Sequence, residues 1–429
     1  MATRPLLLAV ALLTVPLSAA TITLSKPEAS GMSSERLARI GPLIQSHIAA
    51  HDLSGAVTLV ARHGKVVHFE AHGLADVEAN RPMKTSTPFR MASMTKPLTA
   101  VSVLMLLEEG KLLLSDPVSK YIKEFKDPKV AVWNLPNDPR GAGATLVPAR
   151  REITIKDLLT HTSGLANGFE GPAGDFVRRA NLPQGGSLDE RVRRAGPLPL
   201  NFQPGSQWEY SPSTGFDTLG RIVELQSGMN LSQFFKARIF EPLGMKDSFF
   251  TVPSERAGEL PVAYAQRDGK LVRPQANGRG AGAATGAAAP VPSGEYFSGA
   301  GGMTSTAQDY FQFCQMLLNG GVLNGTRLIS RKSVELMTSD ATPGLDLRNY
   351  MNGEQPLQGY GFGLGVRVRR NNGENGWLGS PGDFGWAGAL GTYFWIDPKE
   401  ELIGVVLMQT RVTRLRTEFP NAVYQAIVD

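Results

Sequence analysis

The pattern of apolar and polar positions at the two ends of this 429-residue chain predicts helices and antiparallel hairpins. Apolar residues recur at the spacing of one helix face over residues 33–47, after two serines that are candidate N-caps. Residues 55–73 form two runs rich in β-branched residues on either side of His63-Gly64, which predicts a hairpin. Residues 391–410 have the same form, and Asp397-Pro398 opens the turn between the two runs.

These elements indicate how the chain is organised. A last helix is expected over residues 420–428, with Pro420 in its first turn, where a proline is tolerated. Because hairpins lie near both termini, we predict one antiparallel sheet that is built from N-terminal and C-terminal strands and flanked by helices. The middle of the chain would form a mostly helical lobe. The expected fold class is therefore α/β, in the sense of an α+β arrangement.

The first 20 residues do not fit this folded region. Arg4 is followed by an apolar run from Leu6 to Leu17 and then by the small residues Ser18-Ala19-Ala20, which is the order of a secretory signal peptide. The apolar run is too short to span a bilayer comfortably. We therefore expect residues 1–20 to be a signal peptide, and the mature protein to be secreted or periplasmic with no membrane anchor.

The remaining chain, residues 21–429, is expected to be a single domain of two lobes. The sheet lobe would comprise about residues 30–90 and 300–429, and the helical lobe about residues 91–299. Residues 276–294 are low in sequence complexity, which indicates a loop inside the domain.

Composition and charge exclude several classes of function. With 42% hydrophobic and 19% charged residues, the chain has the composition of a globular protein. Lys and Arg number 44, and Asp and Glu number 39; the excess of five is spread along the chain, so no nucleic-acid partner is expected. The single cysteine, Cys314, cannot form an internal disulfide. Its position on the apolar face of an expected helix favours a buried thiol over a nucleophile.

The motifs give no reason to expect a cofactor or a metal ion. The sequence has no H-E-x-x-H, no Cys/His zinc spacing and no Walker A loop. Gly278, Gly280 and Ala283 match G-x-G-x-x-A, but no β-run leads into them, so no dinucleotide site is expected. The absence of G-x-S-x-G argues against an α/β-hydrolase nucleophile. All six histidines lie at or before His161, so a Ser-His-Asp triad is hard to assemble; His161 is expected to orient a loop.

The candidate chemistry lies in MASMTKPLTA, residues 91–100. Ser93 and Lys96 are three residues apart, so a helix would place the hydroxyl and the amine on one face. Pro97 and the apolar run after it place Ser93 near a helix N-terminus, where free N–H groups favour a developing negative charge. Lys96 would be desolvated, which favours the neutral form that can act as a base for a serine. Two polar residues at the start of a buried helix would give the same pattern.

Two further segments separate these alternatives, because the chain resembles a known superfamily. Ser93-x-x-Lys96, then Tyr210-Ser211 in GSQWEYSPSTGFDTLGRIVE, then Trp386-Ala387-Gly388 follow the order and spacing of serine β-lactamases and penicillin-binding proteins. The chain is most similar to the class C β-lactamase-like branch, which includes the family VIII carboxylesterases. The blocks at 153–165, 239–250 and 299–313 support the resemblance, which covers nearly everything after residue 30.

The resemblance implies a role for each matching residue. Ser93 would be the acylated nucleophile, and Lys96 and Tyr210 would share proton transfer, without a decision on which of the two is the base. The backbone N–H groups of Ser93 and Ala389 would form the oxyanion hole. Trp386, Ala387, Gly388 and Ser213 would contact the substrate. The substrate would be a small-molecule acyl ester or amide, and no cofactor or metal is implied.

Two departures from the β-lactamase pattern favour esters. Trp386-Ala387-Gly388 stands where β-lactamases and D,D-peptidases have Lys-Thr-Gly, so the cation and hydroxyl that hold a substrate carboxylate are missing. A substrate carboxylate without a partner in a partly desolvated cleft would weaken binding by about several kcal/mol, because its lost hydration is not replaced. Pro212 stands in the Tyr-x-Asn motif where the asparagine would be, and Ser213 can replace that amide only in part.

The sequence therefore predicts an exported serine hydrolase, carboxylesterase-like, that cleaves acyl esters through a Ser93 acyl-enzyme. Two alternatives stay open. The first is a β-lactamase, a D-Ala-D-Ala-type peptidase or a D-aminopeptidase. The second is a catalytically idle protein that binds at the cell wall, although such a protein would not need Ser93, Lys96 and Tyr210 together. The oligomeric state is not indicated.

Overall fold

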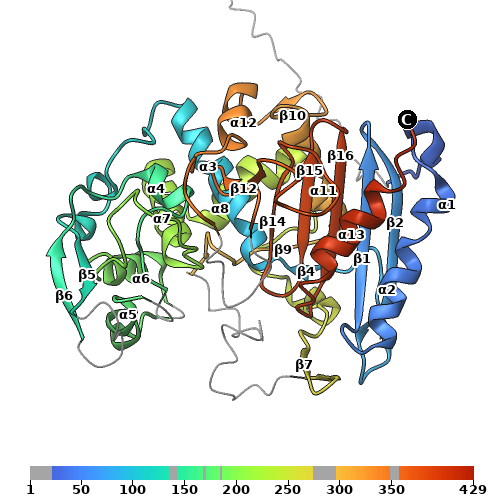
Figure 1. Ribbon diagram of the computed structural model, residues 1–429, viewed down its shortest axis with the longest axis horizontal. Coiled ribbons are helices and arrows are strands. Elements are labelled where there is room, and N and C mark those ends of the chain that lie inside the picture. The colour runs from blue at the N-terminus through green and yellow to red at the C-terminus, as the bar shows by residue number, and fades with distance from the viewer. Residues whose placement is uncertain (1–21, 135–142, 168–170, 184–185, 274–295, 348–356) are drawn as a thin grey trace, which may run out of the picture.

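The computed structural model describes residues 22–134, 143–167, 171–183, 186–273, 296–347 and 357–429. The expected signal peptide at 1–20 and the low-complexity loop at 276–294 lie outside these ranges, and the division into lobes stays a prediction. The fold is a mixed arrangement of one large antiparallel sheet and many helices, which confirms the predicted fold class (Figure 1).

The large sheet has eight strands in the order β12-β13-β14-β15-β16-β1-β2-β3. It joins strands from the two ends of the chain, because β1 pairs with β16 in a register from Ala56–Met408 to Arg62–Leu402. The strands are β1 (Gly55–Arg62), β2 (Lys65–Asp76), β3 (Arg81–Pro82), β12 (Tyr360–Phe362), β13 (Arg367–Arg369), β14 (Phe384–Ala387), β15 (Tyr393–Asp397) and β16 (Leu402–Met408).

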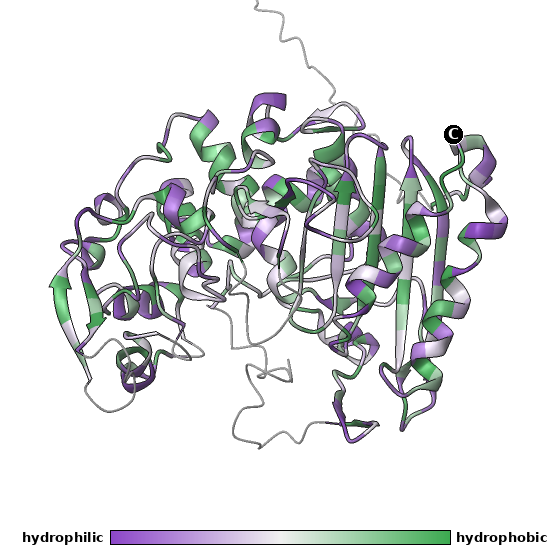
Figure 2. Ribbon diagram, viewed as in Figure 1, coloured by the Kyte–Doolittle hydropathy of each residue, from purple (hydrophilic) through white to green (hydrophobic). Residues whose placement is uncertain are grey.

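Both faces of the sheet are covered. Alternate residues of β1 enter two different hydrophobic clusters: Val57 and Leu59 face the cluster that contains α3 and α11, and Ala56 and Val60 face the cluster that contains α2 and α13. This alternation follows from the two-residue period of a strand. Figure 2 shows hydrophobic residues along the central strands and mixed faces on the outer helices. The remaining strands are short: β4 (Phe89–Arg90), β5 (Lys129–Trp133), β6 (Ala144–Pro148), β7 (Ala265–Arg267), β8 (Lys270–Val272), β9 (Thr304–Ser305), β10 (Val322–Leu323) and β11 (Thr326–Arg327).

The helices differ in how they are buried. The longest helices, α3 and α7, pack against each other. Helix α3 is buried on nearly every side, as its sequence predicts. In the described part of the chain, no helix combines the length and the hydrophobicity that crossing a membrane requires. The helices are α1 (Ser34–Leu37), α2 (Ile40–Ala49), α3 (Lys96–Glu108), α4 (Ile155–Leu159), α5 (Gly174–Ala180), α6 (Leu188–Ala195), α7 (Thr214–Ser227), α8 (Leu231–Phe235), α9 (Glu241–Leu243), α11 (Ala307–Leu318), α12 (Arg331–Met337) and α13 (Leu415–Tyr424).

Both predicted hairpins are present. The β1–β2 turn places His63 at φ 52° and Gly64 at φ 73°, and the β15–β16 turn is held by the Asp397 carboxylate, which accepts from the N–H groups of Lys399 and Glu400. The predicted helix at 33–47 is present but divided into α1 and α2. Pro42 explains the break, because it has no N–H to donate to the carbonyl of Ala38.

The predicted boundaries of the last helix are wrong. This helix begins at Leu415 and ends at Tyr424, so Pro420 lies in its interior and not in its first turn. Leu415, Phe419 and Val423 are fully buried and form one apolar face against the sheet. We infer that burial of this face outweighs the one backbone hydrogen bond that Pro420 cannot make.

Candidate active site

Ser93 lies where β4 leads into α3. It is part of a short 3-10 turn, Ala92–Thr95, that continues directly into the helix. Ala92 has φ 46°, which is a strained conformation for a residue other than glycine and turns the chain sharply just before Ser93. The turn is fixed by Tyr310, whose hydroxyl donates to the carbonyl of Met94 at 2.9 Å. Ser93 is therefore held at a rigid helix start and stays partly exposed.

Lys96 is fully buried directly beneath Ser93. Its Nζ lies 3.1 Å from the Ser93 Oγ, 2.8 Å from the carbonyl oxygen of Pro212 and 2.7 Å from the carbonyl oxygen of Ala300. A carbonyl oxygen can only accept a hydrogen bond, so Lys96 must donate to both. The third contact of Lys96 is a hydrogen bond from its Nζ to the Ser93 Oγ.

Tyr210 completes the group of three. Its hydroxyl donates to the Ser93 Oγ at 2.7 Å, and the Lys96 Nζ lies 5.1 Å from the centre of its ring. The side chain is almost completely buried. The structure therefore brings together the three residues that the sequence analysis named, although Tyr210 lies 117 positions after Ser93.

His161 supports the loop that carries Tyr210. Its Nδ1 accepts from the N–H of Ser211 at 3.3 Å, its backbone carbonyl accepts from the N–H of Glu209, and its ring packs against the Tyr210 ring at 4.7 Å. Burial, and to a smaller extent the nearby Lys96, hold the pKa of His161 well below its usual value, so the imidazole is neutral. This placement agrees with the expectation that His161 orients a loop.

A buried ion pair that the sequence analysis missed lies behind Lys96. Arg191 Nε donates to Asp217 at 3.1 Å, and both side chains are almost completely excluded from solvent. Asp217 also accepts from the hydroxyls of Tyr296 at 2.7 Å and Ser298 at 2.6 Å. Removal of one partner of such a pair leaves an uncompensated buried charge, which is strongly unfavourable.

This ion pair is connected to both carbonyls that hold Lys96. Arg191 donates from its Nη2 to the hydroxyl of Ser213, the residue after Pro212, at 3.2 Å. Asp217 accepts from Ser298 and, at 3.4 Å, from the N–H of Ala300. We infer that Arg191 and Asp217 are positioning residues for Lys96. In the sequence, only the position of Asp217 among the apolar residues of α7 indicates this role, and it does not indicate which residue pairs with Asp217.

Ser213 is held by the buried ion pair, because its hydroxyl accepts from Arg191. The hydroxyl hydrogen can still be donated, so the contact between Ser213 and the substrate stays a prediction. Ser213 is partly exposed at the start of α7.

The predicted oxyanion hole lies where β14 ends beside the Ser93 turn. Gly388 is packed so closely that a Cβ atom on it would lie 2.4 Å from the carbonyl oxygen of Met91. Thr392 donates to that same carbonyl at 3.2 Å, and Arg416 donates to the carbonyl of Gly388 at 2.8 Å.

Ala389 follows in an exposed turn, and its N–H has no hydrogen-bond partner among the described residues. The Ser93 N–H is at a helix start, where no intrahelical acceptor is available. Both groups can therefore donate to an oxyanion.

Trp386 forms an apolar wall behind the site. Its ring lies 5.4 Å from the Tyr210 ring and 5.1 Å from the Phe362 ring, and it is 2% exposed. Ala387, the next residue, is partly exposed. Trp386 stands where the β-lactamase motif has a lysine. The indole ring therefore packs against the Tyr210 ring, and the positive charge of the lysine is absent.

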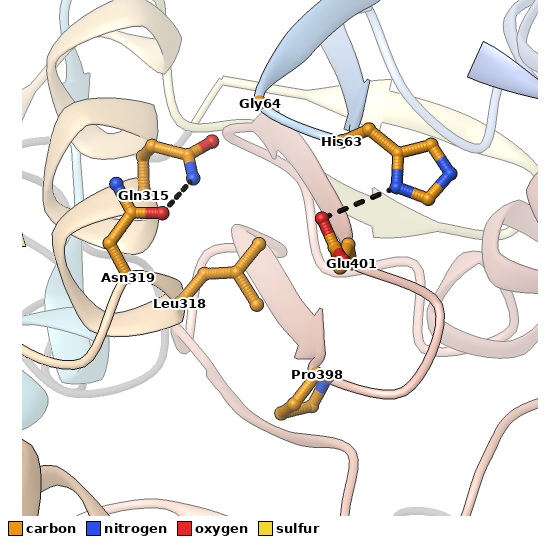
Figure 3. Close-up of a pocket in the computed structure, with 7 residues that line it drawn as sticks. All are labelled: His63, Gly64, Gln315, Leu318, Asn319, Pro398 and Glu401. Atoms are coloured by element: carbon orange, nitrogen blue, oxygen red, sulfur yellow. Dashed lines mark hydrogen bonds and ion pairs between the residues drawn. The ribbon is translucent and has the colours of Figure 1, made fainter.

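A separate polar hollow lies at the opposite end of β15 from the Gly388–Thr392 turn. It is formed by the β1–β2 turn, the β15–β16 turn and the end of α11, and Figure 3 shows His63 and Glu401 paired on one side and Gln315 and Asn319 on the other. None of its lining residues belongs to the candidate active site. We therefore assign the chemistry to the Ser93 site.

Comparisons with known proteins agree with this geometry. The family model described as Beta-lactamase matches residues 41–426. Protein Rv1367c of Mycobacterium tuberculosis is 36% identical over 362 residues, 83% of this chain and 86% of that protein. Esterase EstB of Burkholderia gladioli is 36% identical over 301 residues, 67% of this chain and 72% of that protein.

A solved structure shows the same fold. The structure of EstCE1, described as a hydrolase with promiscuous acyltransferase activity, has a TM-score of 0.73 and 25% sequence identity, and covers 92% of this chain and 99% of that one. The resemblance that was inferred from the motifs is confirmed. The chain belongs to the beta-lactamase family.

Proposed function

We propose that this protein is a serine hydrolase that cleaves acyl esters through an acyl-enzyme on Ser93. The family and its esterase members support serine hydrolase activity. The observation that carries the proposal is the convergence of the Lys96 Nζ and the Tyr210 hydroxyl on one oxygen, the Ser93 Oγ, at 3.1 Å and 2.7 Å. An idle binding protein would have no need to hold a fully buried lysine in contact with a serine hydroxyl.

The reaction divides into two halves. In the first, the proton of the Ser93 hydroxyl passes to the Lys96–Tyr210 pair, and the Oγ forms a bond to the carbonyl carbon of the ester. The oxyanion accepts hydrogen bonds from the N–H groups of Ser93 and Ala389. The C–O bond to the alcohol then breaks, and the same pair returns the proton to the departing alkoxide.

In the second half, water replaces the alcohol. The Lys96–Tyr210 pair takes a proton from the water while its oxygen attacks the acyl carbon of the Ser93 ester. The tetrahedral intermediate collapses, the Ser93 Oγ recovers its proton and the carboxylic acid leaves. The pair starts and ends the cycle in the same protonation state, so no further co-reactant is needed.

The Trp386 wall favours a neutral ester over a β-lactam or a peptide with a free terminal carboxylate. An indole supplies no positive charge for a carboxylate, and the neighbouring Arg416 already donates to the carbonyl of Gly388. A substrate carboxylate that enters a desolvated cleft without a cationic partner binds less favourably.

Substrate preference tests this assignment. We expect the kcat/KM for p-nitrophenyl butyrate to exceed that for nitrocefin, because only nitrocefin carries the carboxylate. Ser93→Ala should lower ester hydrolysis by at least about a thousandfold, since it removes the nucleophile. Ser46→Ala, which changes an exposed serine on α2, should keep the full rate. A higher kcat/KM for nitrocefin would show that the reading of Trp386 is wrong.

We also propose that the protein is exported, because residues 1–20 have the order of a signal peptide. N-terminal sequencing of the protein recovered from a bacterial periplasm or culture medium should start at residue 21. A protein that stays in the cytoplasm with Met1 and the apolar run intact would contradict export and leave the proposed chemistry unaffected.

The role of the buried ion pair is tested by Asp217→Asn. We expect kcat to fall by about tenfold or more, which corresponds to about 1.4 kcal/mol in the barrier, with KM little changed because Asp217 does not contact the substrate. Ser298→Ala, which removes one hydrogen bond to Asp217, should produce a smaller fall in kcat and preserve the fold.

Asp189→Asn is the matched control for this prediction. Asp189 also pairs with arginines, Arg193 and Arg221, but it is partly exposed and not linked to Lys96. If the steady-state kcat of correctly folded Asp217→Asn equals that of Asp189→Asn, the ion pair does not position Lys96.

A further inference from the structure

Three side chains on β2 form a cluster that the proposed reaction does not use. His68, Glu70 and His72 occupy alternate positions of the strand and therefore share one face. The residues between them, Phe69 and Ala71, pack on the cluster that contains α3, so the three polar side chains lie on the opposite face, towards α2. The sheet thus separates them from Ser93.

The ligand atoms of the cluster converge. The His68 Nδ1 lies 3.7 Å from one Glu70 oxygen, the His72 Nε2 lies 3.4 Å from the other, and all three groups have a ligand atom within 4.8 Å of the others. A tetrahedral Zn²⁺ ion with bonds of about 2.0–2.2 Å places its ligands about 3.3–3.6 Å apart. Glu70 is 53% exposed, so its carboxylate can move by the small distance required.

The ring of His68 is held by a side chain of the neighbouring strand β1. The His68 Nε2 lies 2.7 Å from the hydroxyl of Thr58, which is on β1 opposite Glu70. In the tautomer in which Nε2–H donates to the Thr58 hydroxyl, the Nδ1 presents its lone pair towards Glu70. Metal-bound histidines are held in this way by a partner on the other ring nitrogen.

His72 faces Glu70 without forming a hydrogen bond to it. Its Nε2 is buried and has no hydrogen-bond partner among the described residues, while the side chain is 8% exposed. Gly41 on α2 adjoins the cluster, because a Cβ atom there would be in van der Waals contact with the His72 ring at 3.9 Å and with Glu70 at 4.0 Å.

We propose that His68, Glu70 and His72 bind one divalent transition-metal ion of the Zn²⁺ type, with the fourth position open to water or a small anion. Two imidazoles and one carboxylate are a ligand set that Zn²⁺ and Co²⁺ accept in tetrahedral geometry. H-x-E-x-H on a strand differs from the helical and cysteine-based spacings considered in the sequence, which is why the motif analysis predicted no metal. Because the site is on the far face of the sheet, the ion stabilises the folded chain and takes no part in ester hydrolysis.

Cobalt binding tests the site directly. The chain, purified without a polyhistidine tag and freed of metal with a chelator, is titrated with Co²⁺ and followed by its visible absorption. We expect one Co²⁺ per chain with the intense bands of tetrahedral coordination, displacement of Co²⁺ by Zn²⁺, and a higher thermal midpoint in excess Zn²⁺.

Variants assign the ligands. His72→Gln and Glu70→Gln should lose the bands and the thermal shift, and Thr58→Val should weaken Co²⁺ binding by about tenfold or more through His68. His63→Gln, which changes an exposed histidine paired with Glu401, should bind as the unmodified chain does. Near-UV circular dichroism and retained ester hydrolysis report that each variant is folded. The proposal is overturned if the unmodified chain binds no Co²⁺, or if folded His72→Gln binds it equally well.

Discussion

The active site depends on one constraint, which is the complete burial of Lys96 between two backbone carbonyls and the Ser93 hydroxyl. The carbonyls of Pro212 and Ala300 belong to segments that are far apart in the chain, and each accepts from the same nitrogen. The long apolar helix α3 supplies the surroundings that exclude water. A buried amine with any contact missing would be costly, so the fold must place all three with hydrogen-bond accuracy.

The buried ion pair explains how two separate segments are placed so closely. Arg191 reaches the Pro212–Ser213 side through a hydroxyl, and Asp217 reaches the Ser298–Ala300 side through a hydroxyl and an N–H. Gly299 makes this possible, because a Cβ atom on it would lie 2.6 Å from the carbonyl oxygen of Phe216. The buried ion pair is thus coupled to Lys96 through hydrogen bonds and the short backbone segments between them.

The sequence predicts this site unevenly, for physical reasons. Ser93 and Lys96 are found because their spacing is local and Pro97 marks a helix start. Tyr210 is found only through the family resemblance, since no local pattern links it to Ser93. Arg191 and Asp217 leave no interpretable pattern, because a long-range ion pair has no period.

In the fold, too, features that depend on local sequence are predictable and those that depend on long-range packing are not. Both hairpins follow from alternation and turn residues, whereas Pro420 suggests a start for the last helix that is five residues too late. In the structure, the burial of Leu415 and Phe419 sets that start instead. Local rules therefore predict elements well, and tertiary burial sets boundaries where the two conflict.

The most direct test of the central claim is labelling with a fluorophosphonate, which forms a stable adduct with an activated serine, followed by peptide mass mapping. One adduct per chain on Ser93, with ester hydrolysis lost in parallel, is the predicted result. An adduct on another residue, no adduct, or equal labelling of Ser93→Ala would contradict the proposal that Lys96 and Tyr210 activate Ser93.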